Sequence, residues 1–168
     1  MIALACLPLW LCAQDSARAE VYLDVAGLRN GGGIPQDDYL GTVRSGFKAI
    51  ALFRKGNKRS MYSLKKIWGF RWRGGLFRCD VYDMPVCLLE EGEICYWQAE
   101  RTYISEGIDG ELIVLPEPGR GKNVKALAQL RSDVPYVALC DCLDAAEDRA
   151  FVRRCVEGHN RGGLIGMN

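Results

Sequence analysis

Short apolar runs that recur at close, regular spacing between Phe47 and Leu115 constrain the fold of this chain most. Turn residues separate them, as at Gly56-Asn57, Gly74-Gly75 and Asp83-Met84-Pro85. Strands bounded by such residues at this spacing are typical of an antiparallel meander. The sequence therefore predicts strands over residues 20–25, 47–53, 59–64, 65–72, 76–82, 86–89, 94–99, 102–105 and 111–115.

The pattern changes after Pro116, where residues 116–121 are typical of a linker. Asn123, Ser132-Asp133 and Asp144 can each cap a helix, and apolar residues then recur at helical spacing. We expect short helices over residues 124–131, 136–143 and 145–158. The predicted fold is α+β but mainly β: an antiparallel meander forming a small barrel or roll, followed by two or three short C-terminal helices.

The chain has 168 residues and begins with a run, Met1 to Ala13, that contains no charged side chain. This run is too short to span a bilayer as a helix and is typical of a signal peptide, with cleavage after Ala13 or Ala19. We expect an exported protein, periplasmic or secreted. A lipid anchor on Cys6 or Cys12 and a first element of the core are the alternatives. Residues 1–19 would be the signal, 20–160 a single β-rich domain and 161–168 a flexible tail.

Six cysteines follow the predicted signal, and an oxidising compartment would permit disulfides among them. Cys79, Cys87 and Cys95 lie symmetrically about two predicted turns, which would place them side by side on three adjacent strands. Three cysteines permit one bond among themselves, and in the predicted helices the local option is one bond to Cys155, from Cys140 or Cys142. Either two thiols then stay reduced, or one bridge ties the helices to the sheet, which we favour; six buried reduced cysteines are the other alternative. The candidate disulfide residues are Cys79, Cys87, Cys95, Cys140, Cys142 and Cys155.

Charge is segregated along the chain although the formal net charge is only +1. Residues 39–79 hold eleven Lys and Arg and no Asp or Glu, and eight aromatic side chains lie among them. Residues 80–117 reverse the sign, with ten acidic side chains and one arginine. The basic strands could pair with the acidic strands in one sheet, with the aromatic side chains in the core. Alternatively, the basic stretch could form an anion-binding face. The candidate anion-binding residues are Arg54, Lys55, Lys58, Arg59, Lys65, Lys66, Arg71 and Arg73.

Several of these segments together resemble an uncharacterised family of small exported proteins of Bacteroidetes-type bacteria. The resemblance covers roughly residues 45 to 160 and includes the strands at 65–70, 75–78 and 93–97 and the helices from Asn123 to His159. It implies export and a β-rich body with C-terminal helices, and it implies no activity.

No residue set in the sequence predicts an enzyme. His159 is the one histidine, near a glycine-rich tail, and is expected to be a surface residue. No spacing indicates a metal or a cofactor. We therefore expect a non-enzymatic envelope or binding module. The alternative is a polyanion-binding protein that uses the stretch 39–79. Its partner is unknown; an anionic envelope polymer or another envelope protein fits better than nucleic acid.

Overall fold

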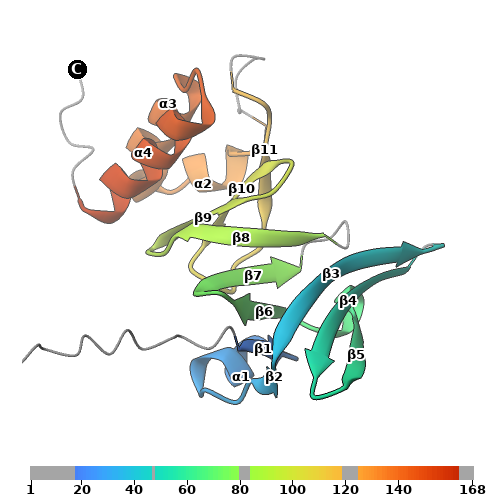
Figure 1. Cartoon of the computed structure of the whole chain (residues 1–168). Helices are drawn as coiled ribbons and strands as arrows, with labels where there is room; N and C mark the ends of the chain where they lie inside the picture. The colour runs from blue at the N-terminus through green and yellow to red at the C-terminus, as the bar shows by residue number, and fades with distance from the viewer. Residues whose placement is uncertain (1–17, 47, 80–83, 119–124, 163–168) are drawn as a thin grey trace, which may run out of the picture.

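The computed structural model describes residues 18–46, 48–79, 84–118 and 125–162, which form two antiparallel sheets and a group of short helices (Figure 1). The larger sheet has eight strands in the order β11-β10-β9-β8-β7-β6-β1-β2. Its strands are β1 (Ala19–Tyr22), β2 (Ile34–Gln36), β6 (Gly69–Trp72), β7 (Gly75–Cys79), β8 (Pro85–Glu90), β9 (Ile94–Gln98), β10 (Thr102–Glu106) and β11 (Ile113–Leu115).

The smaller sheet has three strands in the order β3-β4-β5, with bounds Asp38–Ser45, Lys48–Lys55 and Lys58–Ser63. A 3₁₀ turn, η1 (Leu64–Lys66), leads from it back into the larger sheet. The helices are α1 (Val25–Arg29), α2 (Ala128–Arg131), η2 (Val134–Tyr136), α3 (Val137–Asp144) and α4 (Arg149–Asn160). The predicted fold class is confirmed: the chain is mainly β, antiparallel, with short C-terminal helices. Because the larger sheet is open, the meander is a roll and not a closed barrel.

Both the small sheet and the C-terminal helices pack against one face of the larger sheet. Side chains of residues directly opposite one another in neighbouring strands lie on the same face. One row of such residues crosses the whole meander: Val21, Phe70, Phe77, Cys87, Gln98, Thr102 and Leu115. Val21 packs in the core beneath the small sheet, and Leu115 packs in the core beneath the helices. The small sheet therefore covers the β1 end and the helices cover the β9–β11 end (Figure 1).

The opposite face carries a third cluster, centred on Val86, Trp97 and Tyr103. The segment after β10 covers this face through Ile108 and Leu112. Arg78 fixes that segment, because its Nη1 donates to the carbonyl oxygens of Ile108 and Gly110 at 3.2 and 2.6 Å.

Several predicted elements have different bounds in the structure. The strand expected over 20–25 ends at Tyr22 because the Asp24 carboxylate accepts a hydrogen bond from the Gly27 amide and begins α1. The strand expected over 65–72 begins at Gly69, after η1. The third helix is capped by Asp148, not Asp144, and runs to Asn160. Residues 1–17 of the predicted signal, residues 80–82 of the strand expected over 76–82, the linker residues 119–121, the Asn123 cap and the tail residues 163–168 lie outside the described residues.

The predicted alignment of the three sheet cysteines is wrong. Cys79 lies opposite Pro85, Cys87 opposite Phe77 and Gln98, and Cys95 opposite Ser105. The observed pairs are centred on residue 82 in β7–β8 and near residue 93 in β8–β9, and not on Asp83 and Glu91 as the turn spacing predicts. In addition, Cys95 packs on the opposite face of the sheet from Cys79.

Candidate functional site

The β4–β5 hairpin places four basic side chains together at its tip. Arg54 lies directly opposite Arg59, and Lys55 lies directly opposite Lys58. The turn between them is Gly56-Asn57, and all four side chains are exposed. Like charges directly opposite each other in a sheet destabilise the pairing. The four cations are therefore not neutralised by their partners in the hairpin.

Two carboxylates contact this hairpin, and Asp38 lies directly opposite Arg54 in the β3–β4 pair. Asp38 Oδ1 accepts a hydrogen bond from Trp72 Nε1 at 2.8 Å, and its Oδ2 lies 3.4 Å from Arg54 Nη2. Asp37 Oδ2 accepts from the Gly56 backbone amide at 2.6 Å and so holds the turn in place. These two acidic residues offset the charge of the hairpin only in part.

Arg73 extends the basic surface from the larger sheet. It has a positive φ of 49° in the β6–β7 turn, and its guanidinium carbon lies 4.5 Å from the centre of the Trp72 ring. Trp72 in turn bonds to Asp38, the neighbour of Arg54. Arg73 therefore lies on the same side of the molecule as the β4–β5 hairpin.

The other basic residues of the stretch have different surroundings. Arg71 lies opposite Glu20 in the β1–β6 pair, so here opposite charges do face each other across the sheet. Lys65 and Lys66 are exposed in η1. The Arg78 guanidinium lies over the Trp68 and Trp97 rings and packs against the core. Burial lowers the pKa of its guanidinium, which nevertheless stays charged at neutral pH. Glu20 lies outside the acidic stretch 80–117, and Arg54 of the hairpin likewise lies opposite an acidic residue outside it, Asp38. The predicted pairing of β4 and β5 with the acidic strands is not formed, because these two strands belong to the separate small sheet.

The aromatic side chains of the basic stretch that the structure describes lie in or against the core clusters. Phe53 and Phe70 are fully buried, and Tyr39, Tyr62 and Phe77 pack against them. They are not available to stack with a ligand. The exposed groups of the basic stretch are therefore mainly its Lys and Arg side chains, and an anion would be bound by these.

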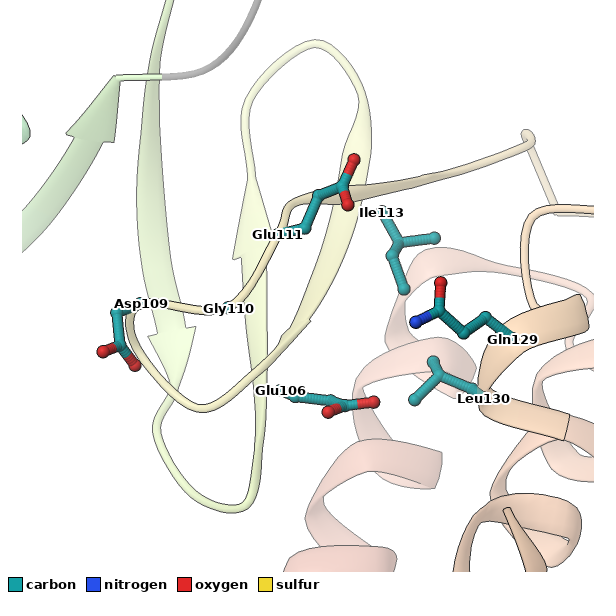
Figure 2. A pocket seen from close by; sticks show the side chains of 7 residues that line it. All are labelled: Glu106, Asp109, Gly110, Glu111, Ile113, Gln129 and Leu130. Carbon is teal, nitrogen blue, oxygen red and sulfur yellow. The ribbon is translucent and has the colours of Figure 1, made fainter. Parts of the chain in front are cut away.

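A pocket of about 260 Å³ lies between the β10–β11 connection and α2 (Figure 2). Its lining includes three acidic residues, Glu106, Asp109 and Glu111. Asp109 points away from the other two in Figure 2 and forms an ion pair with Arg29 at 2.8 Å. Within the described ranges, no group of three His, Cys, Asp or Glu side chains could hold a metal ion. The sequence analysis missed this pocket because its residues come from segments with no shared motif.

His159 is not the surface residue that the sequence predicts. Its side chain is only 10% exposed and packs on the Tyr136 ring, with the ring centres 5.4 Å apart. Its Nε2 lies 4.0 Å from Glu93 Oε1 and makes no hydrogen bond. Burial, with a hydrogen bond to Glu93, raises the pKa of Tyr136 to about 12. Tyr136 therefore stays protonated at neutral pH, and the cluster joins α4 to the β9 end of the sheet.

Two of the six candidate cysteines form a disulfide. Cys142 of α3 and Cys155 of α4 are bonded, with their Cα atoms 5.8 Å apart. Cys79, Cys87, Cys95 and Cys140 remain thiols, so the expected bridge between helices and sheet is not formed. Burial raises the pKa of the Cys87, Cys95 and Cys140 thiols, which makes them weak nucleophiles.

No family model matches this chain, and neither a curated protein nor a solved structure matches it. Of the helices in the described part of the chain, none is both long and apolar enough to cross a membrane.

Proposed function

We propose that this chain is an exported, non-enzymatic binding module that holds an anionic polymer on its β4–β5 hairpin. The observation that carries the proposal is the pair of like-charge contacts, Arg54 with Arg59 and Lys55 with Lys58. Four exposed cations in one hairpin weaken the fold that contains them. An external anion would relieve that repulsion, so binding and folding would stabilise each other.

Export is supported by two independent features. The charge-free start of the chain is typical of a signal peptide. The Cys142–Cys155 disulfide is compatible with an oxidising compartment, in which such bonds form and persist. An exported protein of this kind would meet anionic envelope polymers before it met nucleic acid.

The chemistry of the surface favours a polymer over a small anion. The four cations are exposed on the hairpin, and none of them lines the pocket beside α2. Exposed Lys and Arg bind a polyanion mainly by releasing its condensed counterions. Such binding tracks charge density and falls steeply as salt rises.

Fluorescence anisotropy of labelled heparin, a sulfated polysaccharide, tests the proposal, with labelled neutral dextran as the control polymer. With about four charge contacts and the salt dependence known for nucleic acids, raising NaCl fourfold should weaken heparin binding about 50- to 150-fold. Dextran should not bind. Equal binding to both polymers, or no heparin binding at low salt, would refute the proposal.

A matched pair of variants locates the binding surface. Lys58→Glu/Arg59→Glu should abolish heparin binding. Arg154→Glu/Arg161→Glu makes the same change in net charge at exposed residues of the last helix and its end. This control should retain most of the affinity, because its residues lie in and just after α4, away from the hairpin (Figure 1). Equal losses in the two variants would show that net charge, not the hairpin, governs binding.

A further inference from the structure

The outer face of the small sheet is apolar and open. Along β4, Ala49, Ala51 and Phe53 point into the core, so Ile50 and Leu52 point to the other face. Val43 lies opposite Ile50, and Met61 lies opposite Leu52. Val43 is 44% exposed and Met61 is 70% exposed, and Leu40, at the β3 bulge, is 43% exposed. These five apolar residues, Leu40, Val43, Ile50, Leu52 and Met61, are called the apolar face below.

Basic side chains border this apolar face at both ends. Lys48 precedes Ile50 by two residues and Arg54 follows Leu52 by two, so alternation places both on the same side of β4. Arg59 lies opposite Arg54 and two residues before Met61. The three strands together contain one acidic residue, Asp38, which is already bonded to Trp72 and Arg54. The apolar face is therefore surrounded by net positive charge.

This combination identifies the chemistry of the partner. A soluble polyanion would satisfy the cations but would leave the apolar side chains in water. A second copy of the chain, related by a two-fold axis, would cover the apolar side chains but would bring the same basic border against itself. A surface that offers both negative charge and an apolar layer satisfies both groups at once.

We propose that the outer face of the small sheet docks onto an anionic lipid bilayer. Met61, Val43 and Leu40 enter the boundary between headgroups and acyl chains, while Lys48, Arg54 and Arg59 contact the lipid phosphates. This inference rests on the proposed function, since it uses the same hairpin cations, and it goes beyond a soluble polymer to an anionic bilayer as a second partner of that surface.

The test is co-sedimentation of the full chain with vesicles of phosphatidylcholine, with and without phosphatidylglycerol. The wild-type protein should bind the anionic vesicles and not the neutral ones. Val43→Ser/Met61→Ser removes two apolar side chains without a change in charge and should weaken vesicle binding about tenfold or more. Its heparin affinity should stay unchanged.

The control variant is Leu23→Ser/Val134→Ser, which alters two exposed apolar residues outside the small sheet. It should bind anionic vesicles as the wild type does. Every variant keeps the apolar N-terminal segment, so a difference between variants reports on the small sheet. Lys58→Glu/Arg59→Glu should lose both vesicle and heparin binding.

The outcomes separate the two proposals. Heparin binding without binding to anionic vesicles overturns the lipid inference and leaves the proposed function standing. Unchanged vesicle binding by Val43→Ser/Met61→Ser, or equal binding of the wild type to neutral vesicles, also overturns it. The lipid inference is also overturned if the wild type is a dimer in solution and Val43→Ser/Met61→Ser is a monomer, because the apolar face would then bind a second copy of the chain. Absence of binding to both heparin and vesicles overturns both proposals.

Discussion

Arg54 and Arg59 lie directly opposite each other across the β4–β5 pair, and Lys55 and Lys58 repeat the arrangement one residue nearer the turn. The like charges in these two pairs repel each other across the strands and so destabilise the hairpin. Its inner side contributes Ala49, Ala51 and Phe53 to the core, and that burial holds the two strands together. The fold tolerates this repulsion, and we propose that these like charges lie together because they bind an anion.

Lys58→Glu/Arg59→Glu should stabilise the protein. The change converts two like-charge pairs into two opposite-charge pairs, each worth about 0.2–1 kcal/mol, with screening favouring the lower end. Urea unfolding should show a higher midpoint with an unchanged slope. A lower midpoint would mean that the two side chains make stabilising contacts within the fold.

The Cys142–Cys155 disulfide should stabilise the packing of α3 against α4. Its sequence separation is 13, and a loop of about that length corresponds to about 3 kcal/mol. Cys142→Ser/Cys155→Ser should lose about that much in urea unfolding, and reduction of the wild type should reproduce the loss. Alkylation of the unfolded, unreduced protein should label Cys79, Cys87, Cys95 and Cys140. Alkylated Cys142 or Cys155 in that sample would contradict the assignment.

Asn160 should anchor the end of α4 to the sheet. Its Oδ1 accepts from the Ile94 amide at 3.0 Å, and its Nδ2 donates to the Ile94 carbonyl at 2.8 Å. Asn160→Ala should cost about 1–3 kcal/mol, because both backbone groups lose their side-chain partner. Asn160→Asp keeps the acceptor and should cost less. If Asn160→Ala lowers the free energy of unfolding no more than Arg161→Ala at the neighbouring exposed position, the Asn160 contacts do not stabilise the fold.

Arg78 should act as a structural residue although it belongs to the basic stretch. Arg78→Ala removes the donor that two carbonyl oxygens share and the cation between two tryptophan rings. We expect a loss of about 2–4 kcal/mol on unfolding. The exposed Arg71→Ala, as the comparison, should cost about 1 kcal/mol or less. Equal decreases in the free energy of unfolding for Arg78→Ala and Arg71→Ala would contradict a structural role for Arg78.

Much of the strand order could be predicted because local chemistry determines it. Gly56-Asn57 and the glycines at 74 and 75 mark turns that the structure contains, and the apolar runs between them are strands. Alternation along β7 likewise places Phe77 and Cys79 in one core cluster and Arg78 against the other. Alternation with a period of two is a local property, so one strand suffices to predict it.

Long-range pairing could not be predicted from these patterns. The strand β3 was missed because Gly41 has a φ of 119° and a bulge there interrupts the alternation. The predicted cysteine register is wrong because the two turns are centred on other residues than Asp83 and Glu91. Which charged residue each cation faces depends on which strands become neighbours in the sheet. Arg71 meets Glu20 because β1 joins the sheet beside β6, whereas β4 and β5 form a separate sheet away from the acidic strands.

The salt dependence of heparin binding tests the central claim most directly. For the wild type and for Lys58→Gln/Arg59→Gln, the logarithm of the affinity is measured against the logarithm of the NaCl concentration. Removing two charge contacts should reduce the slope by about 1.4–1.8. An unchanged slope in this variant, or a wild-type affinity that does not respond to salt, would contradict the assignment of the β4–β5 hairpin as the anion-binding surface.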